Sequence, residues 1–318
     1  YFKKIYIIMK LDNLDIRDIF FENIKKIFLK RNDFYILTND ADVFSLQQIK
    51  NHKRFIDAGV CEQNLINIAS GLARKKKKVL IYGFCNFLCH RAYEQIKINI
   101  GSMNLSVIIV GIGPGFSFPY DGPTHHGIQD ISNILTIPEF EIYNLSDNKL
   151  ADYISKNIFK LTGPNYIRLE KGVHPSKFKS TNASKGFEFF SPQKNNKNLI
   201  ITTGFFSHFA EKYIKTVNNC GVINLFKLKN FDQKKLSLIM KKFTKILVYD
   251  ENTSYGGISP ILNKLIIDYG LIKKKFYYLT CSEEKQIFRY RNDRIKILDD
   301  LDIGESALKK KMKYINKS

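Results

Sequence analysis

The chain has 318 residues, 44% of them hydrophobic, which is enough for one large or two medium-sized globular domains. No apolar run approaches the ~18 residues that a membrane-spanning helix needs, so we do not expect a membrane protein. The net charge of +21 comes mainly from lysines spread along the chain, and no nucleic-acid-binding motif accompanies them. We therefore expect solvated lysines rather than a nucleic-acid interface.

The five cysteines, at positions 61, 85, 89, 220 and 281, are an odd number and form no CxxC pair. We therefore expect neither structural disulfides nor a zinc site, and a cytoplasmic location. The stretch 1–10 is too short and too charged for a signal peptide, and both Tyr1 and Met9 remain candidate starts of the native chain.

Helix-like and strand-like segments alternate through the first two thirds of the chain. Helical spacing of apolar residues, or short continuous apolar runs, predict the following elements: helices over 15–31, 62–73, 90–100 and 147–160, and strands over 34–40, 78–84, 105–115, 140–147 and 165–172. Continuous apolar runs are typical of buried parallel strands. The pattern predicts an α/β domain with a parallel sheet flanked by helices over residues 11–173.

A polar stretch rich in Pro, Gly, Ser and Asn follows, and we expect residues 174–197 to be a linker. Alternation then resumes, with strands expected over 199–204, 221–229 and 245–252, and helices up to about 217 and over 258–270. Residues 198–318 are therefore expected to form a second, smaller α/β domain.

Three stretches place polar residues where strands of the first domain end, which is where parallel sheets collect ligands. They are NDAD (39–42), the segment around Glu62 together with 82–95, and the glycine-rich loop 113–130. Glu62 opens an otherwise apolar helix, and a carboxylate there is costly unless something binds it. These stretches are candidates for a binding site.

Taken in order, these motifs resemble the pyrimidine-binding half of transketolase-type thiamine diphosphate enzymes. The resemblance rests on RFIDAGVCEQNLINIASGLA (54–73), FCNFLCHRAYEQI (84–96), DGPTHHGIQD (121–130) and GPNYIRLEKG (163–172). Among these enzymes, the sequence most resembles the separate C-terminal subunit of split transketolases. VYDENTSYGGI (248–258) is similar to the transketolase C-terminal domain, which deoxyxylulose-phosphate synthases and 2-oxo-acid dehydrogenase beta subunits share.

The resemblance implies a cofactor site. Glu62 would contact the aminopyrimidine of thiamine diphosphate as a carboxylic acid, a form that an apolar setting favours, and so promote removal of the cofactor's C2 proton. Phe84 and Phe87 would stack on the ring, and His90 would lie beside it. Asp42 would lie near the cofactor and the subunit contact, unless it only caps the next helix.

The resemblance also implies substrate-binding residues. His125 would bind substrate hydroxyls and assist proton transfer, and Asp121 would contact a sugar hydroxyl. Arg17 and Lys171 would hold a substrate phosphate. His126 has a secondary place, and Glu251 is expected to be structural or interfacial. The family's histidine before the glycine-rich loop is missing, and Ser45 is the nearest match to its serine, so the sugar is not identified.

The GDG motif with which thiamine enzymes hold Mg²⁺ and the diphosphate is absent from the sequence. Either the chain is a fragment, or an N-terminal, diphosphate-binding subunit supplies that half. The chain begins where second subunits of split transketolases begin, so we expect such a partner in an α2β2 heterotetramer. The implied reaction passes a two-carbon ketol unit from a ketose (phosphate) to an aldose.

Two alternatives remain open. One is another thiamine diphosphate chemistry, either deoxyxylulose-phosphate synthesis or that of a 2-oxo-acid dehydrogenase beta subunit. The other is a non-catalytic assembly subunit, with the charge of +21 serving an anionic partner.

Overall fold

A computed structural model describes residues 11–175, 177–178, 183–191, 196–217, 220–282, 284 and 291–318. The chain divides into two compact units, the first made of Tyr1–Pro114 with Asn133–Lys179 and the second of Gly115–Ser132 with Ser180–Ser318. The two candidate starts and parts of the expected linker lie outside the described residues.

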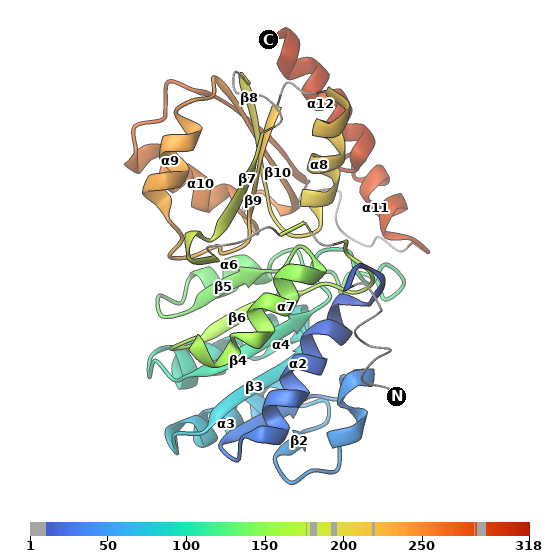
Figure 1. Cartoon of the computed structure of the whole chain (residues 1–318), viewed down its shortest axis with the longest axis vertical. Coiled ribbons are helices and arrows are strands. Elements are labelled where there is room, and N and C mark those ends of the chain that lie inside the picture. The colour runs from blue at the N-terminus through green and yellow to red at the C-terminus, as the bar shows by residue number, and fades with distance from the viewer. Residues whose placement is uncertain are drawn as a thin grey trace. The chain divides into compact units, whose positions relative to one another are not determined.

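The first unit contains a six-stranded sheet in the order β2-β1-β3-β4-β6-β5, and every neighbouring pair is parallel (Figure 1). The strands are β1 (Phe34–Thr38), β2 (Phe55–Asp57), β3 (Lys78–Phe84), β4 (Val107–Ile112), β5 (Glu141–Asn144) and β6 (Asn165–Leu169). The central strands β3 and β4 are almost entirely buried, as their apolar sequences require. The predicted parallel α/β fold is confirmed.

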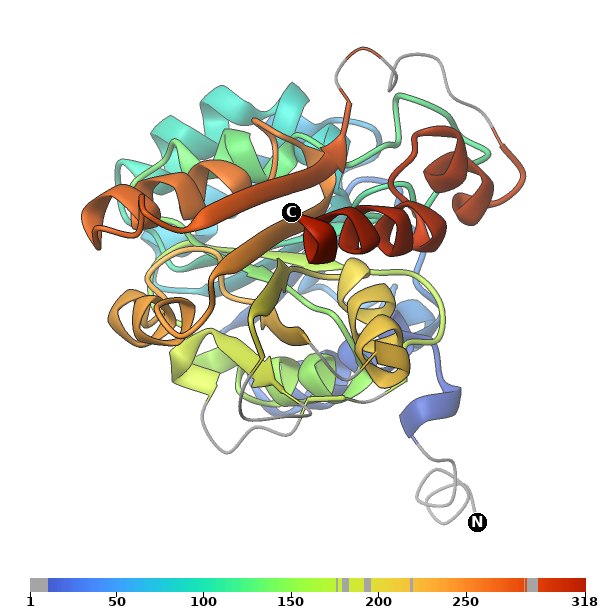
Figure 2. The ribbon, with the colours of Figure 1, turned by 90° about the horizontal axis from the view of Figure 1, so that it is seen from above.

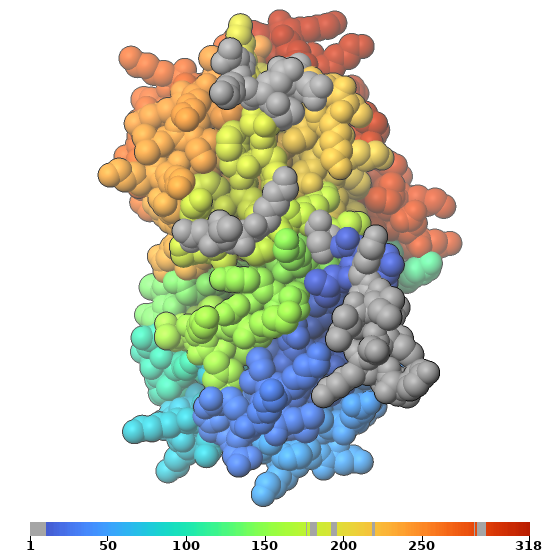
Figure 3. Space-filling view, in the orientation of Figure 1, coloured from blue at the N-terminus to red at the C-terminus, as the bar shows by residue number. Residues whose placement is uncertain are grey.

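Helices cover both faces of this sheet. On one face α2 (Ile16–Lys30) packs against α7 (Asn148–Lys156), where the side-chain amide of Asn23 donates to Asp152 (2.9 Å) and Ser155 (3.0 Å). Figure 3 shows the outer surface of this pair, in blue and green. The segments α3 (Glu62–Arg74), α4 (Cys85–Arg91), α5 (Tyr93–Gln95), η3 (Ile96–Gly101) and α6 (Asp130–Leu135) complete the helices that connect strands β2 to β5.

Helix α4 begins directly at the end of strand β3, close to the sheet. Gly111 of β4 permits this approach, because a Cβ at that position would lie 2.7 Å from the Cβ of Cys85 and 2.5 Å from the hydroxyl of Tyr166. The thiol of Cys85 in turn donates to the carbonyl of Gly113 (3.2 Å). The residues that follow Cys85 are thereby fixed next to the carboxyl ends of β3 and β4.

The second unit contains a five-stranded sheet in the order β11-β10-β8-β9-β7. Its strands are β7 (Phe187–Phe190), β8 (Asn198–Thr202), β9 (Cys220–Leu225), β10 (Lys245–Thr253) and β11 (Lys275–Cys281), and only β7 is antiparallel to its neighbour. The helices are α8 (Phe206–Val217), α9 (Gln233–Met240), α10 (Ser259–Asp268), α11 (Arg294–Asp300) and α12 (Glu305–Lys317). Figure 2 shows α12, in dark red, beside α8, in yellow.

Several elements differ from the prediction. The helix expected over 90–100 is divided between the end of α4, α5 and η3, with a break at Ala92, and η3 has the wide turns of a π-helix. Strand β7 lies inside the stretch 174–197 that we expected to be a linker. Among the described residues, every helix is too short or too polar to span a bilayer.

Candidate active site

Candidate residues of the first unit follow four different strands of the parallel sheet. Asp42 comes after β1, Glu62 after β2 and Lys171 after β6, whereas Phe84 is the last residue of β3. Because the carboxyl ends of parallel strands lie at one edge, all four belong to the edge at which such sheets bind ligands.

Glu62 is the first residue of α3 and is 5% exposed. Its Oε1 accepts a 2.9 Å hydrogen bond from Nη1 of Arg91, the last residue of α4. The carbonyl of Arg91 also accepts a bond from the side-chain amide of Gln63 (3.1 Å). The partner that a buried carboxylate needs is therefore supplied within this chain by Arg91.

Two aromatic rings lie beside this ion pair. The guanidinium carbon of Arg91 lies 3.9 Å from the ring centroid of Phe87, in the geometry of a cation–π contact. The ring of Phe84 lies 5.6 Å from that of Phe87, with the planes inclined by 62°. The structure thus brings together three of the predicted cofactor contacts, namely Glu62, Phe84 and Phe87.

The other two predicted cofactor contacts are placed differently. His90 is exposed, and its Nδ1 is within 2.7 Å of the carbonyl of Asn86, one turn back on α4. Asp42 is exposed and accepts a hydrogen bond from the side-chain amide of Gln47. The segment η2 (Phe44–Ile49) has Val43 at its N-cap, so Asp42 is not the cap that the sequence left open.

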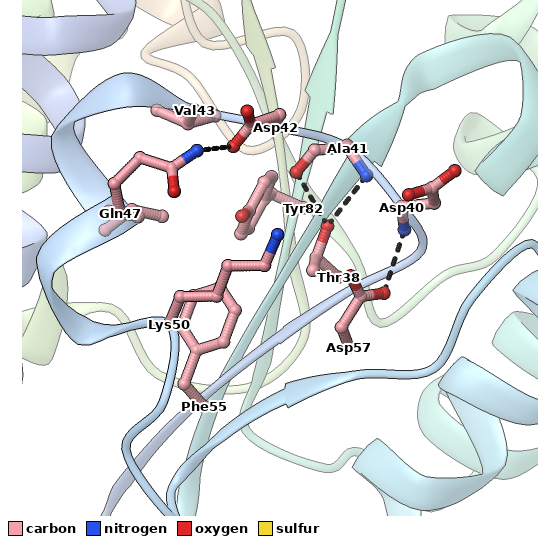
Figure 4. Close-up of a pocket in the computed structure, with 11 residues that line it drawn as sticks. Thr38, Asp40, Ala41, Asp42, Val43, Gln47, Lys50, Phe55, Asp57 and Tyr82 are labelled. Carbon is pink, nitrogen blue, oxygen red and sulfur yellow. Dashed lines mark hydrogen bonds between the residues drawn. The ribbon is translucent and has the colours of Figure 1, made fainter.

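Asp42 lines a small pocket of about 30 Å³ at the ends of β1 and β2, with room for about two water molecules (Figure 4). Asp40, Asp57, Lys50 and the buried Tyr82 also line it. The backbone N–H of Asp40 donates to the carboxylate of Asp57 (3.0 Å). Burial raises the pKa of the Tyr82 phenol, which is therefore neutral at physiological pH.

Arg17 and Lys171, the predicted phosphate contacts, come from segments that Asp15 connects. The Asp15 carboxylate accepts from Nη2 of Arg17 (2.9 Å) and from the backbone N–H of Gly172 (3.0 Å). The N–H of Ile16 donates to the carbonyl of Gly172 (2.8 Å). No pattern in the sequence indicates that Asp15 pairs with Arg17 and also binds the backbone next to Lys171.

The loop 115–132, which carries Asp121, His125 and His126, belongs to the second unit. His125 is partly exposed, and its Nδ1 lies 3.0 Å from the hydroxyl of Thr124. His126 is buried, its ring packs edge-on against Phe116 (centroids 4.8 Å apart), and its Nε2 has no hydrogen-bond partner among the described residues. Burial lowers the pKa of His126 to about 4, so this imidazole is neutral at pH 7.

Glu251 of β10 anchors this loop. It is 6% exposed, and its Oε1 accepts from the backbone N–H of Phe116 (3.0 Å) and from Nε of Arg294 (2.8 Å). Nη2 of Arg294 bonds to the other carboxylate oxygen, and its Nη1 donates to Ser117 (3.2 Å). Gly115 has φ +62° and lies against the same carboxylate, where a Cβ would come 2.0 Å from Oε2.

Neither arginine was predicted from the sequence. A signal for Arg91 was present, because it follows Phe87 by four residues on one helix, a spacing that places two side chains on the same face. Arg294 lies 43 residues beyond Glu251, and no local pattern connects the two.

Comparisons with known proteins give the class of this chain. Residues 12–176 match the family described as transketolase, pyrimidine binding domain, and because the match covers more than half of the chain, the chain belongs to that family. This confirms the resemblance found in the sequence. Members of the family use thiamine diphosphate.

Two relatives are named as parts of transketolases. The chain is 24% identical over 218 residues to a subunit of the apulose-4-phosphate transketolase of Phocaeicola vulgatus, an alignment of 66% of this chain and 69% of that protein. It is 30% identical over 166 residues to the 6-deoxy-6-sulfo-D-fructose transketolase subunit SqwH of a Clostridium species, covering 51% of each. A third relative is 1-deoxy-D-xylulose-5-phosphate synthase of Syntrophomonas wolfei, at 27% identity over 69% of this chain but only 35% of that enzyme.

Solved structures show the same fold. A split-gene transketolase in an inactive β4 tetramer has a TM-score of 0.76 at 19% identity and covers 94% of this chain and 98% of that chain. The transketolase of Campylobacter jejuni has a TM-score of 0.74 at 14% identity, and the chain matches only 47% of it. The chain therefore spans almost all of the split protein but about half of the longer enzyme.

Proposed function

We propose that this chain is the second subunit of a two-chain transketolase. With a separate diphosphate-binding subunit it would transfer a two-carbon ketol unit from a ketose or ketose phosphate to an aldose acceptor. The observation that carries the proposal is that the carboxyl group of Glu62 and the aromatic face of Phe87 together hold a planar group, the guanidinium of Arg91. An aminopyrimidine is also planar, and it can accept a hydrogen bond from a carboxylic acid and stack on an aromatic ring, so the residues present fit the cofactor that the family uses.

Each candidate residue has a role in this proposal. Glu62 would hold a proton at its carboxyl group and orient the aminopyrimidine, while Phe84 and Phe87 would contact the ring's faces. Thiamine diphosphate, when bound, supplies an acidic carbon that can add to a carbonyl group. His90 and Asp42 are proposed as outer contacts of the same site.

The substrate residues are proposed from the resemblance and from their exposure. His125 is partly exposed, and an imidazole can both donate and accept hydrogen bonds, which suits a group that binds sugar hydroxyls and moves a proton. Asp121 is exposed on the same loop and would accept from a hydroxyl. Arg17 and Lys171 would bind a substrate phosphate; for Arg17 this requires competition with Asp15.

A partner subunit is proposed to supply the Mg²⁺ ligands and to cover the first unit's sheet edge, in an α2β2 assembly. Two observations support a partner. Phe44 and Val60 follow the neighbouring strands β1 and β2 and are 86% and 65% exposed, which is typical of a surface that another chain covers. The split-gene transketolase with the same fold is inactive as a β4 tetramer. We further propose that the cytoplasm is the location and that 11–173 and 198–318 are the two functional domains.

The proposal is tested by reconstitution. The chain, its partner, Mg²⁺ and thiamine diphosphate should together convert ketose phosphates, and Glu62→Gln should lower kcat by more than ~100-fold, the scale of acid–base roles. Glu305→Gln is a matched control, because Glu305 is also the first residue of a 13-residue helix and also forms ion pairs. Undiminished activity of Glu62→Gln would mean that the chain is a non-catalytic assembly subunit.

A second candidate is deoxyxylulose-phosphate synthesis, the activity for which several relatives are named. One such enzyme, from Campylobacter jejuni, aligns with 83% of this chain at 25% identity. Comparing ketose phosphates with pyruvate as donors in the reconstituted complex separates the two reactions, and we expect the ketose phosphates to be used.

A further inference from the structure

Arg91 makes two contacts with residues that the proposed function assigns to the cofactor. Its Nη1 donates to Glu62 at 2.9 Å, and its guanidinium carbon lies 3.9 Å from the ring centroid of Phe87. A guanidinium is planar and delocalised, and it donates to a carboxylate. An aminopyrimidine is also planar and can also lie on an aromatic face, but its ring nitrogen accepts from the protonated acid, so an exchange of the two groups requires Glu62 to take up a proton.

The side chain of Arg91 is able to leave this position. It is 48% exposed, whereas the side chain of Glu62 is 6% exposed, so the arginine can turn to water while the acid cannot. Arg91 is also the last residue of α4, and the helical geometry breaks at Ala92. Its backbone is held by the hydrogen bond from Gln63, so the movement involves the side chain alone.

We propose that Arg91 is a positioning residue that takes the place of the aminopyrimidine when the chain is without cofactor, and that the cofactor displaces it. This inference rests on the proposed function. The arginine satisfies the buried carboxylate and covers Phe87, which keeps both residues arranged for a planar ligand. The cofactor then binds more weakly than it would to an open site, because it must first break the Glu62–Arg91 pair.

The pair is tested on the chain alone. Arg91→Met keeps the apolar stem and removes the charge, and Glu62→Gln removes the carboxylate. If Arg91 acts through Glu62, Arg91→Met lowers the urea midpoint of the wild-type chain but has little further effect in the Glu62→Gln background. Additive effects of the two substitutions would show that the residues are not coupled and would overturn the proposal.

Displacement is tested by calorimetric titration of thiamine diphosphate into the reconstituted complex with Mg²⁺. Arg91→Met should bind about twofold to fivefold more tightly, the range that a partly exposed ion pair allows. Arg91→Lys keeps the charge, so its affinity for thiamine diphosphate should remain near that of the wild type. This variant also tests whether the complex tolerates a substitution at position 91. Weaker or unchanged binding by Arg91→Met would mean that Arg91 supports the bound cofactor or is indifferent to it, and would overturn the proposal.

The chain offers a matched control for this titration. Arg31 is 47% exposed, forms an ion pair with Asp33 (2.6 Å) and lies 4.3 Å from the ring centroid of Phe159, so Arg31→Met removes the same kinds of contact elsewhere. It should leave cofactor binding unchanged. If the wild-type complex itself binds no thiamine diphosphate, the proposed function has failed and this inference with it. Binding by wild type without a gain in Arg91→Met overturns only the role of Arg91.

Discussion

Each unit of the molecule contains a buried glutamate paired with an arginine, and the two pairs differ in how completely they are enclosed. Arg294 is 11% exposed and meets both oxygens of Glu251, which also accepts the N–H of Phe116. Arg91 is 48% exposed and gives Glu62 a single hydrogen bond. The Glu251–Arg294 pair is therefore closed, whereas the Glu62–Arg91 pair is open to water on the arginine side.

The difference in exposure indicates different roles for the two pairs, one structural and one in ligand binding. A closed pair with a backbone donor holds a loop in place, because removing either partner leaves a charge that water cannot reach. An open pair can exchange its exposed partner for a ligand at a small cost. The same two residue types therefore serve anchoring in the second unit and, we propose, ligand exchange in the first.

The largest expected effect is that of Glu251→Ala. It leaves the guanidinium of Arg294 buried without its carboxylate and the N–H of Phe116 without its acceptor, so the free energy of unfolding should fall by about 3–5 kcal/mol. Urea unfolding followed by circular dichroism measures this. Hydrogen exchange should also accelerate in 115–132, and a loss below about 1 kcal/mol would contradict a closed pair.

The second-largest expected effect is on the pH dependence of stability, and it comes from His126 in the loop 115–132. The pKa of His126 is about 4 in the folded chain, against about 6.5 when unfolded, so both states are neutral above pH 6.5. As the pH falls from 6.5 towards 4, only the unfolded state binds the proton, and stability should decrease by up to about 3 kcal/mol. Urea midpoints measured across this window test it.

His126→Gln should remove that pH dependence, because glutamine does not titrate there. His52→Gln is the control, as this histidine is partly exposed and lies in the first unit. An unchanged slope in His126→Gln would show that another group titrates in this range.

The smallest effect on stability is expected for Glu62→Gln, the same substitution that should abolish most activity. Arg91 can turn to water when its partner is lost, so the free energy of unfolding should change by no more than about 1 kcal/mol. Comparing the urea midpoint with that of Glu251→Gln sharpens the contrast. A loss as large for Glu62 as for Glu251 would mean that the Glu62–Arg91 pair is also closed.

Much of the fold was predictable because its signals are local. The continuous apolar runs of β3 and β4 are typical of buried strands, and the capped, amphipathic sequence of α2 is typical of a helix. Strands β2, β7 and β11 were missed. Strands β2 and β7 have only three and four residues, and most residues of β11 are only half-buried. All three are edge strands, whose pairing depends on a neighbour and not on their own hydrophobicity.

The candidate site shows the same division. The sequence alone determined the order of the motifs, the family and the position of Glu62 at the start of an apolar helix. Only the tertiary structure decided that Arg91 pairs with Glu62, that Asp15 accepts from the N–H of Gly172 and that Glu251 holds the loop of His125. Helix and strand patterns arise from neighbours within a few residues, whereas these contacts join residues that are far apart in the sequence and that only the folded chain brings within hydrogen-bond distance.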